Sequence, residues 1–351
     1  MNTATREAVA LLQELISIPS FSRQEAKAAD KIADFIGSKS MPLKRCGNNV
    51  FSVSPRFDEE KLTLLLDAHI DTVKVASGWQ HDPFTPTMEG GRLYGLGSND
   101  DGGSLVSLMQ AYFTLADEEL PFNIVFSASA EEEVSGKGGI EMSLREMPHI
   151  DAGIIGEPTG MQAAVAEMGL MVIDFTAHGK AGHAARGEGV NAIYKAVDDI
   201  EKIRSMSFDR HSAHLGDTRA TVTIINAGTQ HNVIPAECVF TADVRSNDQY
   251  TNPELFEIIS SQVESEARAR SFRLNPSGIG SNHPLVQRVA QMGVKTFGSP
   301  TLSNQALLAF PTIKIGPGQS SRSHTADEYI ETAEIANAID FYIEFLKGLK
   351  L

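Results

Sequence analysis

The sequence predicts an α/β protein: a domain with a mainly parallel sheet and helices on both faces, with a smaller α+β domain inserted into it. In the first part of the chain, short apolar runs alternate with helical patterns, as in layered α/β domains. From about residue 166, the strand candidates alternate apolar with polar residues, which is typical of strands with one face in water. After residue 275 the helical and βα pattern returns. We therefore expect a discontinuous domain, 1–165 and 276–351, and an inserted domain, 166–275.

Four near-continuous apolar runs are the strand candidates of the larger domain, because parallel strands are buried on both faces. They cover 62–66, 122–128, 152–156 and 312–316. Apolar residues at helical spacing predict the helices that accompany these strands. The helices cover the N-terminus, where Thr3 or Thr5 would be the cap, then 24–38, 104–117 and the chain from about 332.

The inserted domain has its own strand and helix candidates. Its strands are expected at 169–177, 220–226 and 238–244, and its helices over 190–206 and 254–270. The alternation of apolar and polar residues in these strands favours an antiparallel sheet with one covered face.

The chain is acidic, with a formal net charge of −15 and a pI near 5.1. Nucleic acids and anionic membranes bind basic patches, so neither is expected as a partner. No apolar run approaches the roughly 20 residues that span a bilayer, and the N-terminus does not resemble a signal peptide. The two cysteines, Cys46 and Cys238, lie far apart, which favours a reducing compartment over a disulfide scaffold. We expect a soluble, cytoplasmic protein.

Histidine and carboxylate side chains follow all four predicted strands of the larger domain. They are His69 and Asp71, then Glu131 to Glu133, then Glu157, and finally His324. Ligand sites in open α/β sheets lie outside the carboxyl ends of the strands, so these side chains are expected to share one site. A glycine-rich turn, 93–104, adds Asp100 and Asp101. It matches neither GxGxxG nor a phosphate-binding loop with its lysine, and a carboxylate that bridges two cations fits it better.

The residue types at this site indicate the metal. Imidazole and carboxylate without thiolate suit zinc, with manganese or cobalt as possible substitutes. His69 and Asp71 are two residues apart, which suits a ligand and a carboxylate that orients its imidazole. Glu132 and Glu133 would point apart on extended backbone, so one could hold metal while the other faces a substrate.

A series of short motifs in order along nearly the whole chain resembles the acetylornithine deacetylase / succinyl-diaminopimelate desuccinylase family of co-catalytic zinc hydrolases. The motifs are ISIPSFS (16–22), AHIDTV (68–73), GWQHDPFTP (78–86), YGLGSNDDGG (94–103), AEEEVSG (130–136), GEPT (156–159), GKAGHAARGEGVNAI (179–193), NVIPAEC (232–238), DVR (243–245) and SHTADEYI (323–330).

The resemblance implies a set of residues that hold two zinc ions. These are His69, Asp100, Glu133, Glu157 and His324. Asp100 would bridge the ions, with His69 on one and His324 on the other. Asp71 would orient His69, and Glu132 would be the general base. Glu131 is the alternative to Glu132, and the register of the motif favours Glu132.

The resemblance also implies that the inserted domain is a lid that forms a homodimer. A lid histidine from the partner subunit would reach the carbonyl of the substrate, and His183 matches it. Asn232 and Arg245 match residues that hold the substrate, the arginine by pairing with a carboxylate.

Two positions depart from the family pattern. The bridging aspartate is usually followed by Met-Lys-Gly, whereas here Asp101, Gly102 and Gly103 follow Asp100. The spacing from GLG favours Asp100 over Asp101 as the bridge. Asn304 stands where family members often have aspartate, which could bear on substrate choice.

The function expected from these residues is metal-dependent hydrolysis of the amide bond of a small N-acyl amino acid. A deacetylase for acetylornithine or acetylcitrulline, acting in arginine biosynthesis, is the first hypothesis. An N-succinyl-amino-acid desuccinylase is the second, with Arg322 as a candidate contact for the extra carboxylate. A dipeptidase or aminopeptidase on the same scaffold is the third. A metal carrier without activity would be expected to lack the base or a ligand, and here Glu132 and every expected ligand type are present.

Overall fold

A computed structural model describes residues 1–351, which form two compact units. Unit 1 consists of Met1–Val165, Ile279–Phe297 and Ser303–Leu351. Unit 2 consists of Ala166–Gly278 and Gly298–Leu302. No helix of the chain combines the length and the apolar character needed to cross a membrane.

The large sheet has the strand order β1-β2-β6-β3-β7-β17-β8-β15, and β16 also pairs with β8. The strands are β1 (Lys44–Cys46), β2 (Asn49–Val53), β3 (Thr63–His69), β6 (Asn123–Ser129), β7 (Ala152–Ile155), β8 (Ala163–Glu167), β15 (Ser277–Gly278), β16 (Thr296–Ser299) and β17 (Thr312–Lys314). The four central strands, β6, β3, β7 and β17, are parallel, and the pairs of β2 with β6 and of β17 with β8 are antiparallel. The prediction of a mainly parallel sheet is therefore confirmed at its centre.

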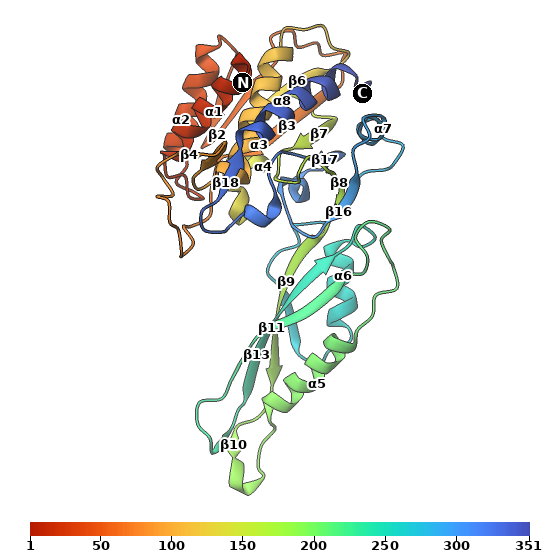
Figure 1. Cartoon of the computed structure of the whole chain (residues 1–351). Coiled ribbons are helices and arrows are strands. Elements are labelled where there is room, and N and C mark those ends of the chain that lie inside the picture. The colour runs from red at the N-terminus through yellow and green to blue at the C-terminus, as the bar shows by residue number, and fades with distance from the viewer. The chain divides into compact units, whose positions relative to one another are not determined.

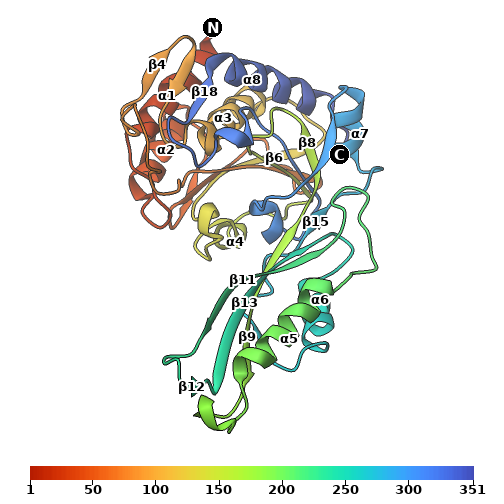
Figure 2. The same cartoon turned by 60° about the horizontal axis from the view of Figure 1, so that its bottom comes forward.

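Helices cover both faces of this sheet. They are α1 (Thr3–Ile16), α2 (Ala26–Ser38), α3 (Gly103–Leu115), α4 (Ile140–Leu144), α7 (Pro284–Gln291) and α8 (Thr332–Lys347). Alternate residues of β3 show the two faces: Leu64 and Leu66 pack into the core shared with α1, α3 and α8, whereas Leu65 packs with Ile140 of α4. Figures 1 and 2 show α3 and α8 on one side of the sheet, and Figure 2 shows α4 on the other. A separate three-stranded sheet has the order β18 (Tyr329–Glu331), β5 (Arg92–Tyr94) and β4 (Thr87–Glu89).

The first helix begins at Thr3, earlier than either predicted cap, Thr3 or Thr5, would allow. Its cap is Asn2, whose side-chain oxygen accepts a hydrogen bond from the backbone N–H of Thr5 at 2.8 Å. Asparagine and threonine are both good capping residues, so composition alone did not distinguish them.

Unit 2 contains an antiparallel sheet with the order β11-β13-β9-β14. Its strands are β9 (Gly169–His178), β11 (Arg219–Ala227), β13 (Glu237–Ser246) and β14 (Glu266–Ala269). The helices α5 (Ala192–Ser205) and α6 (Asn252–Ser260) share a buried core with residues from one face of this sheet. A short two-stranded antiparallel sheet, β10 (Gly182–His183) with β12 (Val233–Ile234), completes the unit.

The predicted helix over 254–270 is wrong beyond Ser260. Residues 266–269 form the edge strand β14, which pairs with Ile173 to Thr176 of β9. The sequence EARA has high helix propensity, but the free edge of β9 offers it a ladder of hydrogen bonds, and tertiary pairing overrides the propensity.

Candidate metal centre

The predicted metal-site residues of unit 1 lie together, because the strands that precede most of them end at the same edge of the sheet. His69 is the last residue of β3, Glu133 follows β6, and Glu157 follows β7. Asp100 lies in a tight turn just before α3, and His324 lies beyond β17.

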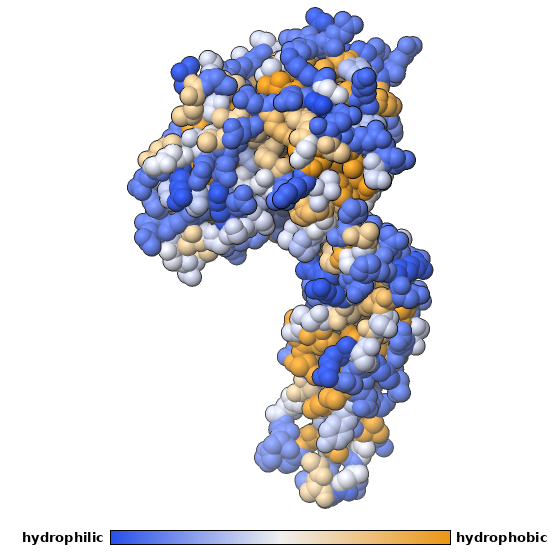
Figure 3. All heavy atoms as spheres, turned by 45° about the vertical axis from the view of Figure 1, so that its right-hand side comes forward, coloured by the Kyte–Doolittle hydropathy of each residue, from blue (hydrophilic) through white to orange (hydrophobic).

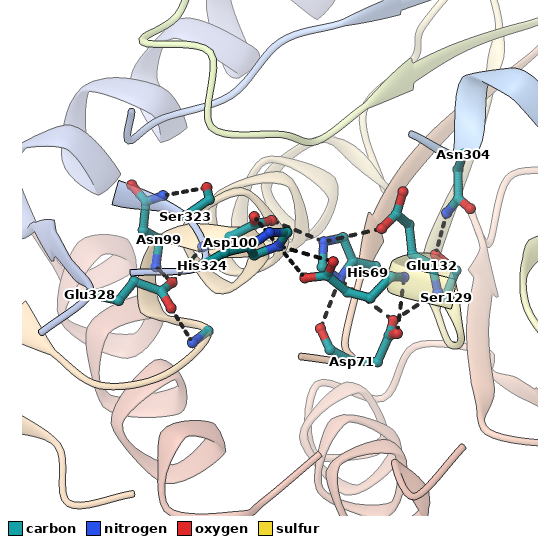
Figure 4. A network of polar contacts seen from close by, with 12 residues as sticks. His69, Asp71, Asn99, Asp100, Ser129, Glu132, Asn304, Ser323, His324 and Glu328 are labelled. Atoms are coloured by element: carbon teal, nitrogen blue, oxygen red, sulfur yellow. Dashed lines mark hydrogen bonds and ion pairs between the residues drawn. The ribbon is translucent and has the colours of Figure 1, made fainter. Parts of the chain in front are cut away.

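The carboxylate of Asp100 lies between two imidazoles (Figure 4). Its Oδ1 is 3.2 Å from Nε2 of His69, and its Oδ2 is 3.5 Å from Nε2 of His324. The same nitrogen of His324 is 3.0 Å from a carboxylate oxygen of Glu133. One oxygen of Asp100 therefore faces each histidine, which is the arrangement that a carboxylate bridging two cations requires.

Glu132 and Glu157 lie on the His69 side of this centre. An oxygen of Glu132 is 3.9 Å from Nε2 of His69, and the ligand atoms of His69, Glu132 and Glu157 all lie within 4.8 Å of one another. The same limit holds for His69, Asp100 and Glu133. Two overlapping groups of possible metal ligands thus share His69.

The side chain of Glu131 points away from His69, unlike that of Glu132. It has a left-handed φ of 56°, its carboxylate accepts a hydrogen bond from the N–H of Gly138 at 3.4 Å, and it lies 3.8 Å from Nε of Arg23. Of the two glutamates considered for the base, Glu132 is therefore the one placed beside His69.

Asp71 holds both His69 and the glutamate turn. Its carboxylate accepts hydrogen bonds from the backbone N–H of Glu132 at 2.9 Å and of Glu133 at 3.1 Å, and from the hydroxyl of Ser22 at 2.7 Å. Nδ1 of His69 is 2.9 Å from the main-chain oxygen of Asp71 and 3.6 Å from its carboxylate. The imidazole is thus oriented chiefly by the backbone of Asp71, while the carboxylate places the two glutamates.

The electrostatics of the cluster reflect its crowding. Burial, reinforced by the neighbouring carboxylates, raises the pKa of Glu132 and of Glu157 well above their usual value. Burial opposes protonation of His69, but its contacts with Asp100, Asp71 and Glu132 outweigh burial and raise the pKa of His69 well above the usual value. Burial would raise the pKa of Asp100, yet the contacts with His69 leave it lowered.

These residues fit a pair of divalent cations. Four carboxylates and two imidazoles converge, so carboxylate groups are concentrated in a small volume. A bound cation would balance that charge. Nitrogen and oxygen donors without thiolate are a set that zinc accepts.

The three predicted site residues of unit 2 fall into two places. His183 and Asn232 lie together: the N–H of Ala184 donates to the main-chain oxygen of Asn232 at 3.0 Å, and both side chains are exposed. Arg245 lies near the other end of β13, where it pairs with Leu170. It is eight residues from Glu237, the first residue of β13, or about 27 Å along an extended strand. Its guanidinium contacts Asp243 through Nε at 2.8 Å and Nη2 at 3.1 Å.

Two further residues singled out in the sequence have contacts within the chain. Arg322 contacts Glu334 through Nη1 at 2.7 Å and lies over the ring of Tyr329, with 17% of its side chain exposed. Asn304 donates from Nδ2 to the carboxylate of Asp67 at 2.8 Å and to the hydroxyl of Ser129 at 2.9 Å (Figure 4). The amide at position 304 is therefore explained by a buried partner rather than by substrate choice.

Sequence reasoning missed two residues that support the site. They are Ser22, which contacts Asp71, and Glu328, which contacts the turn of Asp100. Both lie inside quoted motifs, ISIPSFS and SHTADEYI, and a polar side chain within a motif was the available signal.

Comparisons with known proteins agree with this geometry. Residues 65–348 match the family described as Peptidase family M20/M25/M40. The chain is 30% identical over 304 residues to the acetylornithine deacetylase of Pectobacterium carotovorum subsp. carotovorum, an alignment that covers 81% of this chain and 79% of that relative.

Solved structures show the same fold. Aminopeptidase PepT from Bacillus cereus is similar with a TM-score of 0.77 and 19% identity, over 98% of both chains. The YXEP protein of Bacillus subtilis, a dinuclear metal binding peptidase from the M20 family, is similar with a TM-score of 0.73 and 16% identity, over 98% of this chain and 97% of that one.

The chain belongs to peptidase family M20/M25/M40. The resemblance indicated by the motifs is thereby confirmed, and so is the α/β fold class. Membership and the ligand groups together support a metal-dependent amidohydrolase.

Proposed function

We propose that this protein is a zinc-dependent deacylase that hydrolyses the amide bond of an N-acetylated amino acid. The observation that carries the proposal is the placement of Asp100 between His69 and His324, with Glu132 beside His69. In the proposed centre, His69 and Glu157 would hold one ion, His324 and Glu133 would hold the other, and Asp100 would contribute to both.

Glu132 is the proposed general base. Zinc ions bound in this centre would polarise the amide carbonyl and bring the pKa of bound water to about 7. Glu132 takes a proton from the attacking water and passes it to the nitrogen of the leaving amine. Its position suits both steps, because one of its carboxylate oxygens lies 3.9 Å from Nε2 of His69, beside the proposed ions.

Unit 2 is proposed as a lid that also forms the homodimer. Hydrophobic side chains are exposed on α5 and on the edge strand β11: Tyr194 at 71%, Val197 at 51%, and Ile224 and Ile225 at 50% each. Figure 3 shows hydrophobic residues among the hydrophilic ones on the visible face of this unit. An apolar patch beside an unpaired strand edge is typical of a protein interface, and a second copy of the chain would cover both.

The exposed β10–β12 sheet and Arg245 would then contact the substrate. His183 of the partner subunit would donate to the oxyanion that forms on the carbonyl. In each chain Asn232 lies beside His183, because the N–H of Ala184 donates to its main-chain oxygen. Arg245 would pair with the α-carboxylate of the amino acid. Its contact with Asp243 uses Nε and Nη2, so substrate would approach from Nη1.

Acetylornithine or acetylcitrulline is the proposed substrate, which would place the enzyme in arginine biosynthesis. The similarity to a curated acetylornithine deacetylase supports this choice. Cys46 and Cys238 are both free thiols, which fits action in the cytoplasm.

The test is amine release from a matched panel by enzyme loaded with zinc, with and without a chelator. The panel contains N-acetylornithine, N-acetylcitrulline, their N-succinyl counterparts and several dipeptides. Chelator-sensitive release from an acetylated amino acid supports the proposal. Preference for the succinylated compounds makes the protein a desuccinylase, preference for dipeptides makes it a peptidase, and no release from any compound refutes the enzymatic assignment.

A further inference from the structure

Glu328 is a buried acidic residue that none of the proposed chemical steps uses. It lies four residues after His324 and directly before β18, and 2% of its surface is exposed. The ladder between β18 and β5 pairs Tyr329 with Tyr94, and the main-chain oxygen of Glu328 accepts a hydrogen bond from Gly95 at 3.0 Å. The position of its backbone is therefore set by the small three-stranded sheet.

The side chain of Glu328 reaches into the turn that carries Asp100. Its Oε2 accepts a hydrogen bond from the N–H of Gly97 at 3.0 Å, and its Oε1 accepts from the N–H of Asn99 at 2.8 Å and of Asp100 at 2.9 Å (Figure 4). Three backbone donors thus converge on one carboxylate. Gly97 has a left-handed φ of 76°, which turns its N–H toward the other two.

A side-chain amide in place of this carboxylate could not accept hydrogen bonds from all three backbone N–H groups of the turn. A carboxylate has acceptor sites on both oxygens, whereas the NH₂ group of glutamine would point a donor at the N–H of Gly97 or at those of Asn99 and Asp100.

The same short segment, residues 324–328, contains two residues that contact Asp100. His324 presents its imidazole to Oδ2 of Asp100 at 3.5 Å, and Glu328 holds the backbone N–H of Asp100. Movement of the turn by about 1 Å would change both the distance to His324 and the 3.2 Å distance to His69.

We propose that Glu328 is a positioning residue that holds the turn of Asp100 so that its two carboxylate oxygens face His69 and His324 together. The inference rests on the proposed function only in taking Asp100 as a metal ligand. Residues that orient metal ligands typically contribute about 10–100-fold to metal affinity.

The experiment measures zinc affinity by competition with a chromophoric chelator, on wild type and on Glu328→Gln, together with thermal unfolding of the metal-free proteins. The matched control is Asp199→Asn in unit 2. Asp199 is 1% exposed and accepts hydrogen bonds from the backbone N–H groups of Glu264 and Ser265, so the chemical change is the same in a part of the chain without proposed metal ligands.

We expect Glu328→Gln to lose about 10-fold or more in zinc affinity, with its metal-free fold retained, while Asp199→Asn binds zinc as wild type does. Wild-type zinc affinity in Glu328→Gln would overturn the inference, and so would an equal loss in the control. If Glu328→Gln gives no folded protein, Glu328→Asp keeps the charge but sets the carboxylate back by one methylene group, and wild-type affinity in that variant would overturn the inference. A wild-type protein that binds no zinc would instead refute the proposed function.

Discussion

Replacing Asn304 by aspartate should destabilise the protein, because its amide faces the carboxylate of Asp67 in the interior of unit 1. Nδ2 of Asn304 donates to Asp67 at 2.8 Å and to Ser129 at 2.9 Å, and the hydroxyl of Ser129 donates to Asp67 at 3.1 Å. Asn304 is 2% exposed and Asp67 is fully buried. Aspartate at position 304 would remove both amide donors and bring a second carboxyl group against the first.

The magnitude follows from these contacts. A hydrogen bond to a charged group contributes about 1.5–3 kcal/mol, and two buried carboxylates cannot both stay ionised at contact, so one must take up a proton. We expect Asn304→Asp to lower the free energy of unfolding by about 2–4 kcal/mol at pH 7. The loss should be smaller at pH 5, because protonation of one carboxyl then costs less.

A double variant in which the residues at positions 67 and 304 are exchanged tests this explanation most directly. Adding Asp67→Asn to Asn304→Asp restores one amide and one carboxylate with their positions exchanged, so at least half of the lost stability should return. The assay is urea unfolding of the wild type, the two single variants and the double variant, all metal-free. A single variant within about 0.5 kcal/mol of wild type, or a double variant no more stable than Asn304→Asp, would refute the reasoning. The double variant should also keep the substrate preference of the wild type.

Three further outcomes are expected. Glu132→Gln should lower turnover by about 10²–10⁴-fold with unchanged zinc content, and unchanged activity would move the base to another residue. His183→Ala should lower turnover by about 10²–10³-fold while zinc content stays the same, and loss of zinc would contradict its assignment to the substrate carbonyl. Burial would raise the pKa of Asp199, but its hydrogen bonds from Ser265, Glu264 and Lys202 outweigh burial and lower it. The stability from this group is therefore present above the unfolded pKa of about 3.9 and is lost as the pH falls through the lower folded value. Asp199→Asn should lower the free energy of unfolding by about 1–2 kcal/mol at pH 7 and by less at pH 3, as measured by urea unfolding; an equal loss at both pH values would contradict this.

The strands that carry the site could be predicted because their signal is local. The runs at 62–66 and 122–128 are apolar almost throughout, and they became β3 and β6, with His69 and the glutamates at their ends. The edge strand β14 could not be predicted in this way. Its residues favour a helix by propensity, and only the pairing with β9, far away in the sequence, makes them a strand.

The sequence by itself determined the family, the fold class and the set of residue types that meet at the carboxyl ends of the strands. Tertiary structure alone decided how those residues are held. Asn304 lies 237 residues from Asp67, and Glu328 lies 228 residues from Asp100, yet each pair is in hydrogen-bond contact. Helical and strand periodicity depends on neighbours within a few residues, so it can be read along the chain. Contacts between distant segments depend on how the elements pack. The ion pair of Arg322 with Glu334 likewise became visible only in the tertiary structure.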